Sequence, residues 1–367
     1  MKIAVIGLGI AGLSACAELA RRGHAVEGFE QFDLMHAFGS SHGDTRIFRL
    51  TPGEGDIYVR MAARAREGWR RWEEIGAAPL IDWTGGMMAG PSDSTFVRSC
   101  IQLGERYGHA HRVMTGAEAN AETGGAFAFP RDWLVCRQED CGPTFADRTR
   151  AFLIKHAHEL GAALHDGVKI DAIRSGALLI EGEARAFDRV IVSAGAWGAQ
   201  LLPEFAQHLT VRRKVIAWLD APARLPVICV DNDVGLYGMT APEGRYKVGL
   251  HSVGETVGAD AVRDASEADA IEVFEAVRTL LPGLSSPRRW ARCLYTMTPD
   301  EHFLMAPSHE HANTLFFSAC SGHGFKYAPV LGEIAADWAE GKAREELDAF
   351  GLANRSAMMT PLGARAQ

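Results

Sequence analysis

The feature that most constrains the fold is a glycine-rich turn between a short apolar strand and a helix at the start of the chain. Residues 2–6 (KIAVI) have the length and apolar character of a buried strand, and Gly7, Gly9 and Gly12 follow in the pattern GLGIAG. In such a turn the first glycine permits a tight bend, the second lets a ligand approach the backbone, and the third lets the helix pack on the strand. The helix is expected over residues 13–22, and its N-terminus would face anionic groups such as phosphates.

A second strand that ends in an acidic residue completes this unit. Residues 24–30 (HAVEGFE) follow the glycine that closes the helix, and Glu30 stands eighteen residues after Gly12. An acid in that place accepts hydrogen bonds from the ribose of an adenosine group. The start of the chain therefore predicts a βαβ unit that binds a dinucleotide, either NAD or FAD. A glycine turn without a ligand and a secretory signal peptide are the alternatives.

Composition excludes several other classes of protein. The chain has 367 residues, of which 47% are hydrophobic and 23% charged, and this suits a globular enzyme large enough for two domains. A formal net charge of -8 argues against a nucleic-acid-binding surface, and no run of about 18 apolar residues predicts a membrane span. The seven cysteines are odd in number and form no CxxC pair, which favours a reduced, cytoplasmic protein.

The rest of the chain alternates between helical and strand-like patterns. Apolar residues at helical spacing predict helices over residues 58–75 and 143–160, and a further helix that Ser266 caps. Strands and turns of a different layer are expected over residues 82–140 and 211–253. A last strand, NTLFFSAC, runs into a glycine turn that opens a helix. Because the chain crosses between these layers several times, the sequence predicts a mixed α/β fold whose two domains are each discontinuous.

The segment GSSHGDTRIFR is polar and ends with two arginines, Arg46 and Arg49, three residues apart. If this segment is helical, the two guanidinium groups share one face. Cations in that place would favour negative charge on a flavin ring or hold the carboxylate of a substrate. A solvated basic loop explains the same composition.

Four motifs occur in the order and spacing of one known family. They are GLGIAG with Glu30, SSHGDTRIFR, ARCLYTMTPDEHFL and SGHGFKYAPVLGE. Over nearly its whole length the chain resembles the monomeric sarcosine oxidase and N-methyltryptophan oxidase family, within the glycine oxidase and D-amino acid oxidase group. The resemblance implies a two-domain FAD-dependent oxidoreductase with a Rossmann-like βαβ FAD domain and a substrate domain built on a mainly antiparallel sheet. The FAD domain would comprise residues 1–82, 141–211 and 296–367, and the substrate domain residues 83–140 and 212–295.

The resemblance assigns roles to residues around the flavin. Cys293 matches the cysteine that attaches FAD covalently, through a thioether to the flavin 8α carbon, although packing as a small hydrophobe is the usual fate of a buried cysteine. Lys247 matches the lysine that activates oxygen, where a fixed positive charge stabilises developing negative charge. Further positions of the family's flavin environment are held here by His42, Thr45, Arg46, Gly324 and Lys326.

A second set of residues matches the family's substrate site. Arg49 and Lys326 match the pair that binds the substrate carboxylate, since two cations converge on one anion. An imidazole and two phenols are available to order the amine: His251, Tyr237 and Tyr295. Gly322 is also assigned to substrate binding and, with Gly324, fits a turn whose following helix directs its N-terminus at the flavin pyrimidine ring. The residues expected to act in catalysis are Lys247, His251, Arg46 and Tyr295. The run of Asp300, Glu301 and His302 suggests a metal site by residue type, but neighbouring side chains point to different faces, so we interpret the run as structural and expect no metal.

The resemblance implies oxidation of an N-methyl or cyclic secondary α-amino acid to the imine, with O2 reoxidising the FAD and giving hydrogen peroxide. A dehydrogenase that passes electrons to a carrier and a non-catalytic protein that kept the fold are the alternatives. The expected partners are a small-molecule amine and O2, without nucleic acid or membrane, and the family default is a monomer. Cys229 stands near the place of a methionine that borders the family's substrate pocket, so the size of the substrate stays open.

Overall fold

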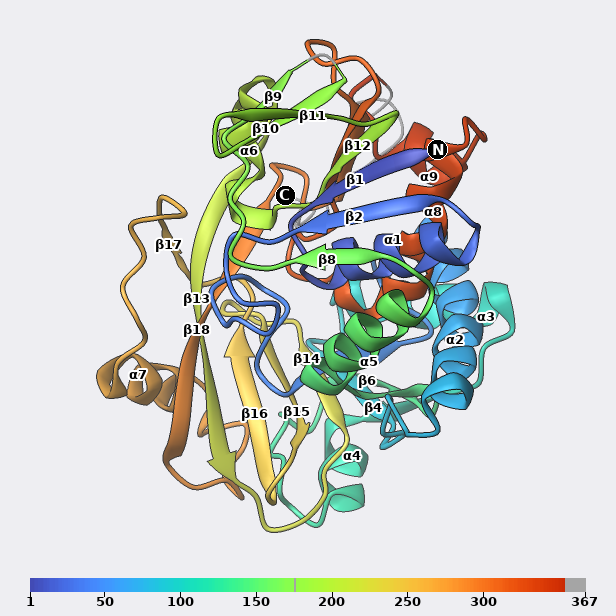
Figure 1. Ribbon diagram of the computed structural model, residues 1–367. Coiled ribbons are helices and arrows are strands. Elements are labelled where there is room, and N and C mark those ends of the chain that lie inside the picture. Colours follow the sequence, from blue (N-terminus) through green and yellow to red (C-terminus); the bar gives the residue numbers. More distant parts are fainter. Residues whose placement is uncertain (175, 354–367) are drawn as a thin grey trace.

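The computed structural model, which describes residues 1–174 and 176–353, contains a large, mainly parallel sheet at the upper right of Figure 1. Its strand order is β19-β20-β12-β1-β2-β8, and β19 runs antiparallel to β20. The strands are β1 (Lys2–Ile6), β2 (Ala25–Phe29), β8 (Ala163–His165), β12 (Arg189–Val192), β19 (Leu304–Pro307) and β20 (Thr314–Ser318). Helix α1 (Ile10–Arg21) joins β1 to β2, so the expected βαβ start is confirmed. The helix begins earlier than expected because Gly9 is already its N-cap.

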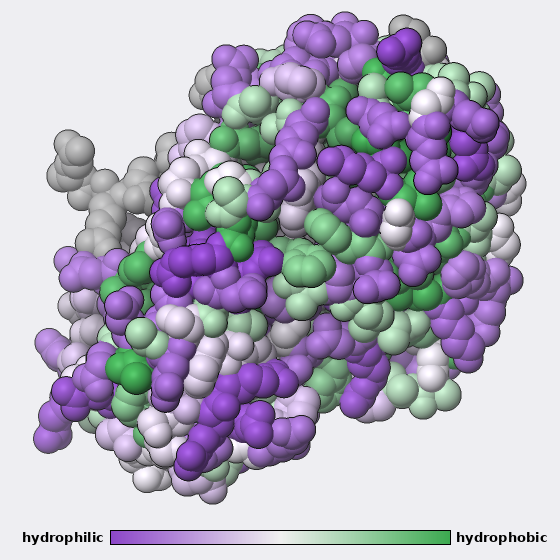
Figure 2. All heavy atoms as spheres, turned by 60° about the vertical axis from the view of Figure 1, so that its left-hand side comes forward, coloured by the Kyte–Doolittle hydropathy of each residue, from purple (hydrophilic) through white to green (hydrophobic). Residues whose placement is uncertain are grey.

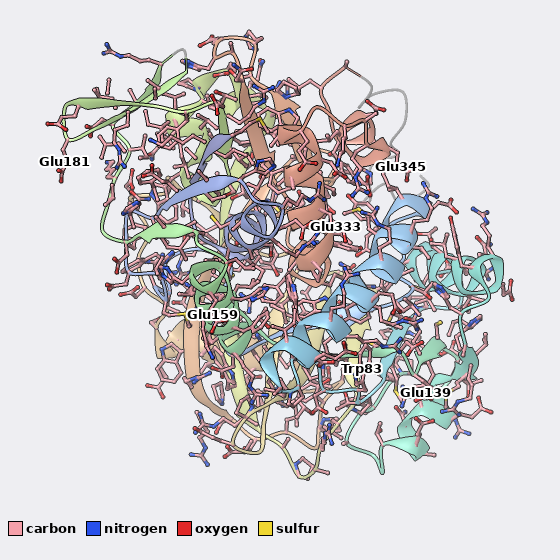
Figure 3. The ribbon with its side chains drawn as sticks, turned by 45° about the vertical axis from the view of Figure 1, so that its right-hand side comes forward. Trp83, Glu139, Glu159, Glu181, Glu333 and Glu345 are labelled. Carbon is pink, nitrogen blue, oxygen red and sulfur yellow. The ribbon has the colours of Figure 1, made fainter. Side chains whose placement is uncertain are left out.

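Alternate residues of β1 face two different layers. Ile3 and Val5 pack into a core with the helices on one side of the sheet. Ala4 and Ile6 pack into a core with a small antiparallel sheet on the other side. The helices are α1, α2 (Asp56–Gly76), α5 (Ala146–Glu159) and α8 (Ala328–Ala339), and the small sheet holds β9 (Ala172–Arg174), β10 (Ala177–Ile180) and β11 (Glu183–Ala186). An ion pair of 2.9 Å between Arg64 and Glu333 links α2 to α8, and Figure 3 shows Glu333 on α8 beside α2.

The second large sheet is mainly antiparallel, with the order β17-β13-β16-β15-β14-β4-β6-β5 and β18 paired to β13. The pair β14 and β4 is parallel. The strands are β4 (Gly86–Gly90), β5 (His111–Thr115), β6 (Leu134–Gln138), β13 (Thr210–Asp220), β14 (Val227–Val230), β15 (Leu236–Ala241), β16 (Arg245–Leu250), β17 (Glu255–Thr256) and β18 (Pro287–Met297). Helix α7 (Glu267–Val277) packs on one face through a core that includes Ala217, Leu219 and Val248. The opposite face carries Ile216 and Lys247 toward the site described below.

The caps of two helices illustrate what the local sequence specifies. Ser266 accepts a hydrogen bond from the amide of Asp269 at 3.2 Å, and the Asp269 carboxylate accepts one from the amide of Ser266 at 2.8 Å, so the expected cap of α7 is confirmed. Helix α3 (Thr95–Tyr107) was not expected, since residues 82–140 were assigned to strands and turns. Its signals are the N-cap Ser94 and a glycine at the C-cap, and its buried face follows helical spacing.

Two further expectations are corrected by the strand pair β3 (Thr45–Arg49) and β7 (Cys141–Phe145). The end of the GSSHGDTRIFR segment is a strand, not a helix, so Arg46 and Arg49 do not share a face by helical spacing. The helix expected over residues 143–160 begins only at Ala146, because the residues before it pair with β3. The polar and apolar residues of these segments alternate in a pattern that fits a helix or a strand. The pairing between β3 and β7 determines that a strand forms.

Short elements complete the described chain. They are α4 (Gly116–Glu122), α6 (Gly198–Leu201), α9 (Glu345–Ala349), and the 3-10 turns η1 (Gly195–Trp197), η2 (Pro203–His208) and η3 (Phe325–Tyr327). Within residues 1–174 and 176–353, no helix has the length and apolar character needed to cross a membrane. The face shown in Figure 2 is mostly hydrophilic, with small apolar groups between the polar residues. The mixed α/β fold is confirmed, whereas the predicted domain boundaries stay a prediction, and residues 354–367 of the predicted FAD domain lie outside the described part.

Candidate active site

The glycine turn of the first βαβ unit has the backbone that its sequence predicts. Gly7 has a φ of +86°, which favours glycine, and a Cβ on Gly12 would lie 2.0 Å from the carbonyl oxygen of Gly7. The third glycine therefore allows the close packing of α1 on the turn. Gly9 is the N-cap of α1, so the first amides of the helix point out of the turn.

Glu30 directly follows β2 and is buried. Its carboxylate accepts hydrogen bonds from the amide of Leu8 at 2.9 Å and from the amide of Phe32 at 3.2 Å. Together with Gly7 and Gly9 it lines a cleft of about 290 Å³. Glu30 thus braces the glycine turn in addition to lining the cleft, a contact that the motif alone did not predict.

The cleft continues into a larger cavity of about 720 Å³, which lies between β3, the antiparallel sheet and the turn before α8. The residues that line both spaces are Ile10, Ser40, Ser41, Ala319 and Cys320. A cleft beside a helix N-terminus that opens into a larger cavity fits FAD, because the cleft would hold the diphosphate and the cavity would hold the ring system. Buried polar atoms without a hydrogen-bond partner among the described residues include Arg49 Nη1 and His323 Nδ1, and because both residues line the cavity, these atoms could bond to a group held there.

Lys247 lies on β16 and is 1% exposed. Its ammonium group donates to the carbonyl oxygen of Gly43 at 2.8 Å and to that of Thr45, and it lies 5.8 Å from the centre of the Trp218 ring. Burial, and then the neighbouring Arg46, lower the pKa of Lys247 well below its usual value. The lysine therefore ties the loop before β3 to the antiparallel sheet and stands at the wall of the cavity.

Cys293, on β18, also lines the cavity and is 2% exposed. Arg46 Nη2 lies 3.8 Å from the Cys293 sulfur and also donates to the carbonyl oxygen of Ser40 at 2.5 Å. Burial raises the pKa of the Cys293 thiol, while Arg46 acts in the opposite direction. Burial lowers the pKa of His42, in the loop before β3, to about 3, so the His42 imidazole is neutral.

The two cations predicted to bind a carboxylate do come together, and a third residue joins them. Glu54 accepts a hydrogen bond from Arg49 Nη2 at 2.6 Å, and the Lys326 ammonium lies 3.7 Å from the same oxygen. Lys326 also donates to the carbonyl oxygen of His323 at 2.8 Å. Burial alone would raise the pKa of Glu54, but Arg49 and Lys326 hold it well below its usual range.

This cluster has a net charge of +1 when all three groups are ionised. Burial lowers the pKa of Lys326 to about 8, and Glu54 opposes that shift. Arg49 keeps one buried nitrogen, Nη1, without a hydrogen-bond partner among the described residues. The cluster can therefore take one further carboxylate. Glu54 was not predicted from the sequence, because nothing in the loop TPGEGD points to the distant lysine.

Another part of the cavity wall carries neutral polar groups. Tyr295 donates to the Tyr237 hydroxyl at 3.4 Å, and the rings of His251 and Tyr295 are 5.8 Å apart. Burial, then the charge of Lys214, lowers the pKa of His251 to about 4, and burial raises the pKa of Tyr237 to about 12. A Cβ on Gly322 would lie 2.5 Å from the Tyr295 ring, so the glycine lets the turn before α8 pass close to these rings.

The structure thus brings most of the predicted site residues to one continuous space. Those that line the cleft or the cavity are Gly7, Gly9, Glu30, Arg46, Arg49, Tyr237, Lys247, His251, Cys293, Tyr295, Gly322, Gly324 and Lys326. Gly12 packs against the turn, and His42 and Thr45 are buried but line neither space. The acidic and histidine run forms a turn: the Asp300 carboxylate accepts from Thr298 Oγ1 at 2.9 Å, and His302 Nδ1 lies 3.0 Å from the Tyr58 hydroxyl.

The comparison with known families gives this geometry a context. The family described as DAO, FAD dependent oxidoreductase, matches residues 2–338. The chain belongs to this family. An N-methyl-L-tryptophan oxidase of Citrobacter koseri is 32% identical, over 92% of this chain and 94% of the relative. One of Salmonella arizonae is 31% identical, over 91% of this chain and 93% of the relative. The resemblance read from the four sequence motifs is therefore confirmed, and so is the dependence of this FAD oxidoreductase on its flavin.

Solved structures of other FAD oxidoreductases share the fold. The open form of NikD, described as an unusual amino acid oxidase essential for nikkomycin biosynthesis, has a TM-score of 0.82 and 20% identity, over 94% of this chain and 96% of that one. Glycine oxidase from Geobacillus kaustophilus has a TM-score of 0.81 and 19% identity, over 96% of this chain and 98% of that one. At these identities the likeness extends to the fold, and the substrate has to be argued from the site.

Proposed function

We propose that this FAD oxidoreductase oxidises a secondary α-amino acid, N-methylated or cyclic, to the imine, and that O2 reoxidises the flavin and yields hydrogen peroxide. The observation that carries the proposal is the cluster of Arg49, Glu54 and Lys326 in the cavity wall. Two buried cations share a single internal carboxylate, so a second carboxylate, that of the substrate, would complete the charge balance. The curated relatives are named as oxidases of an N-methylated amino acid, which supports the same class.

The neutral side chains of His251 and Tyr237 support a neutral amine as the reacting form of the substrate. His251, with a pKa of about 4, and Tyr237, with a pKa of about 12, are both uncharged at neutral pH. Such groups orient a nitrogen by hydrogen bonds without fixing it as an ammonium ion. Bound FAD supplies the two-electron acceptor. The substrate loses a hydride equivalent from carbon and a proton from nitrogen, and water then hydrolyses the imine.

Two residues are proposed to act at the flavin itself. Lys247 is a buried lysine on the cavity wall, and its protonated form there would stabilise negative charge that develops on oxygen. Cys293 is proposed to attach the flavin covalently, which its position on the cavity wall beside Arg46 supports. Gly7, Gly9, Gly12 and Glu30 are proposed to hold the adenosine diphosphate half. The remaining roles stay as the sequence predicts them, including Arg46 and Tyr295 in catalysis.

The wider setting of the enzyme is also a proposal. None of the seven cysteines, all of which lie in the described part of the chain, forms a disulfide, and this supports a reduced, cytoplasmic location. We retain the monomer of the sequence prediction and the two discontinuous domains, one around the parallel sheet and one around the antiparallel sheet.

The covalent bond has a direct test. Wild-type protein should keep its flavin after acid precipitation, whereas Cys293→Ser should release it into the supernatant, because serine oxygen does not form the thioether. Cys16→Ser, a buried cysteine in α1 that does not line the cavity, is the matched control and should keep the flavin bound. Release of all flavin from wild-type protein would show that attachment does not occur.

The substrate class is tested by a panel of amines that differ in one feature at a time. Sarcosine, pipecolate and N-methyl-L-tryptophan are compared with the same amines lacking the carboxylate, and peroxide release is measured. Turnover should require the carboxylate, and the best side chain should report the width of the cavity. Equal turnover without the carboxylate would contradict the proposal. Flavin reduction without peroxide release would instead favour a dehydrogenase.

A further inference from the structure

A buried lysine that no predicted role includes lies next to the residues proposed to orient the amine. Lys214, on β13, is 2% exposed. Along β13, Arg212 and Ile216 line the cavity, and Lys214 stands between them on the same side of the strand because side chains alternate. Its cross-strand partner on β18 is Cys293, the proposed point of flavin attachment.

The Lys214 ammonium holds the chain that carries His251. It donates to the carbonyl oxygen of His251 at 2.6 Å and to that of Val253 at 2.6 Å, just beyond the end of β16. On the other side, the amide of His251 donates to the carbonyl oxygen of Gly235 at 2.9 Å. The backbone of His251 is therefore fixed from both directions. Leaving a buried carbonyl group without a hydrogen-bond partner costs free energy, so the segment would shift if the ammonium were removed.

Two further contacts show that the local structure is fitted around this side chain. The ammonium lies 5.1 Å from the centre of the Tyr295 ring. A Cβ on Gly254 would lie 2.9 Å from Cδ of Lys214, so a glycine at this position lets the chain cross the lysine stem. Lys214 thus contacts both the segment of His251 and the ring of Tyr295, the two groups proposed to orient the amine.

We propose that Lys214 is a positioning residue: through its two hydrogen bonds to carbonyl groups and its contact with the Tyr295 ring, it holds His251 and Tyr295 where the substrate nitrogen binds. This inference rests on the proposed function for its substrate, but not for its effect on His251. Several charged or titratable groups face His251 from the surrounding elements, namely Lys214, Tyr295, Arg49, Glu54, His323 and Lys326. After burial, the charge of Lys214 is the largest influence that lowers the pKa of His251.

The test uses the FAD-loaded protein and the variants Lys214→Met, Lys214→Gln and Lys214→Arg. Methionine keeps the length but removes the charge and the donors, so KM for the amine should rise about tenfold, with a smaller change in kcat. As pH is lowered, kcat/KM should begin to fall at a pH about one unit higher than in wild type, because the pKa of His251 rises when the cation is lost. We call this low-pH part of the profile the acid limb. Glutamine can donate to one carbonyl and should recover part of KM without moving the acid limb back. Arginine retains the charge and should return the acid limb toward that of wild type.

A second readout does not depend on turnover. The titration of His251 can be followed by NMR in protein with labelled histidine, with His251→Gln identifying the resonance. Lys214→Met should raise this titration by about one pH unit, whereas Lys155→Met, at an exposed lysine on α5, should leave it unchanged. If wild-type protein oxidised no amine in the panel, the proposed function would fail, and this titration would still decide the role of Lys214.

Each outcome bears on the inference. An unchanged KM and an unchanged His251 titration in Lys214→Met would overturn it. Loss of activity in all three variants, together with a lower melting temperature and an unmoved His251 titration, would assign Lys214 to general stability and would overturn it equally. A raised titration with a raised KM supports it.

Discussion

The charge cluster of Arg49, Glu54 and Lys326 makes a specific prediction for Glu54→Gln. Glutamine keeps an oxygen that can accept the hydrogen bond from Arg49, but it removes the negative charge 3.7 Å from the Lys326 ammonium. Simple repulsion suggests that a carboxylate ligand would then bind more tightly. The burial of Lys326 predicts a different result, because the lysine depends on Glu54 to stay protonated.

The magnitude follows from the distance. Two unit charges at 3.7 Å interact by about 4 kcal/mol at an effective dielectric constant of about 20, and this corresponds to about 3 pKa units. The pKa of Lys326 is about 8 in the wild type, so it should fall to ~5 in Glu54→Gln. Since a carboxylate binds the protonated lysine, its affinity should decrease as pH rises through the pKa of the free enzyme.

The assay is a titration of the oxidised enzyme with benzoate, an unreactive carboxylate, followed by the change in the flavin spectrum between pH 5 and pH 9. Wild-type affinity should begin to fall near pH 8, and that of Glu54→Gln about 3 pH units lower. Lys326→Met should show no such fall in benzoate affinity, which we call the break, between pH 5 and pH 9. Glu345→Gln, an exposed carboxylate on α9, is the control and should behave as wild type. A break at the same pH in wild type and Glu54→Gln would refute the reasoning.

Three further predictions concern other parts of the molecule. Gly12→Ala should greatly lower the FAD content and the melting temperature, because its Cβ would lie 2.0 Å from the Gly7 carbonyl oxygen; unchanged FAD content, measured after purification, would contradict this. Lys247→Met should slow reoxidation by O2 by at least tenfold, with a smaller effect on flavin reduction by the amine, and stopped-flow absorbance separates the two steps; an unchanged rate of reoxidation would remove the proposed role of the lysine. Ser266→Ala should lower the free energy of unfolding by about 1 kcal/mol without changing kcat/KM, as measured by denaturant unfolding, whereas a large loss of activity would show that α7 influences the cavity.

Much of the fold could be predicted where local sequence is sufficient. The first βαβ unit follows from a strand of apolar residues and three glycines whose positions match the backbone found in the structure. The cap at Ser266 is likewise a local signal. By contrast, the strand character of Arg46 and Arg49 depends on pairing with β7, nearly a hundred residues later in the chain. A helical or a looped segment would fit the same letters.

Some residues of the candidate site could be predicted from the sequence, and others could not. Resemblance to a family placed residues such as Lys247 and Cys293, and the structure brings them to one cavity. Glu54 was missed because its role depends on contacts with Arg49 and Lys326, which meet only in the folded chain. Lys214 was missed for the same reason, since its partners are two carbonyl groups that carry no sequence signal.

The central claim is that this FAD oxidoreductase takes electrons from a secondary α-amino acid and passes them to O2. The most direct measurement adds sarcosine, pipecolate or N-methyl-L-tryptophan to the enzyme without oxygen, records the flavin absorbance, and then admits air. The account predicts that at least one of these amines bleaches the flavin, and that air restores the colour with release of one hydrogen peroxide for each substrate oxidised. A flavin that stays oxidised with every amine would contradict the account.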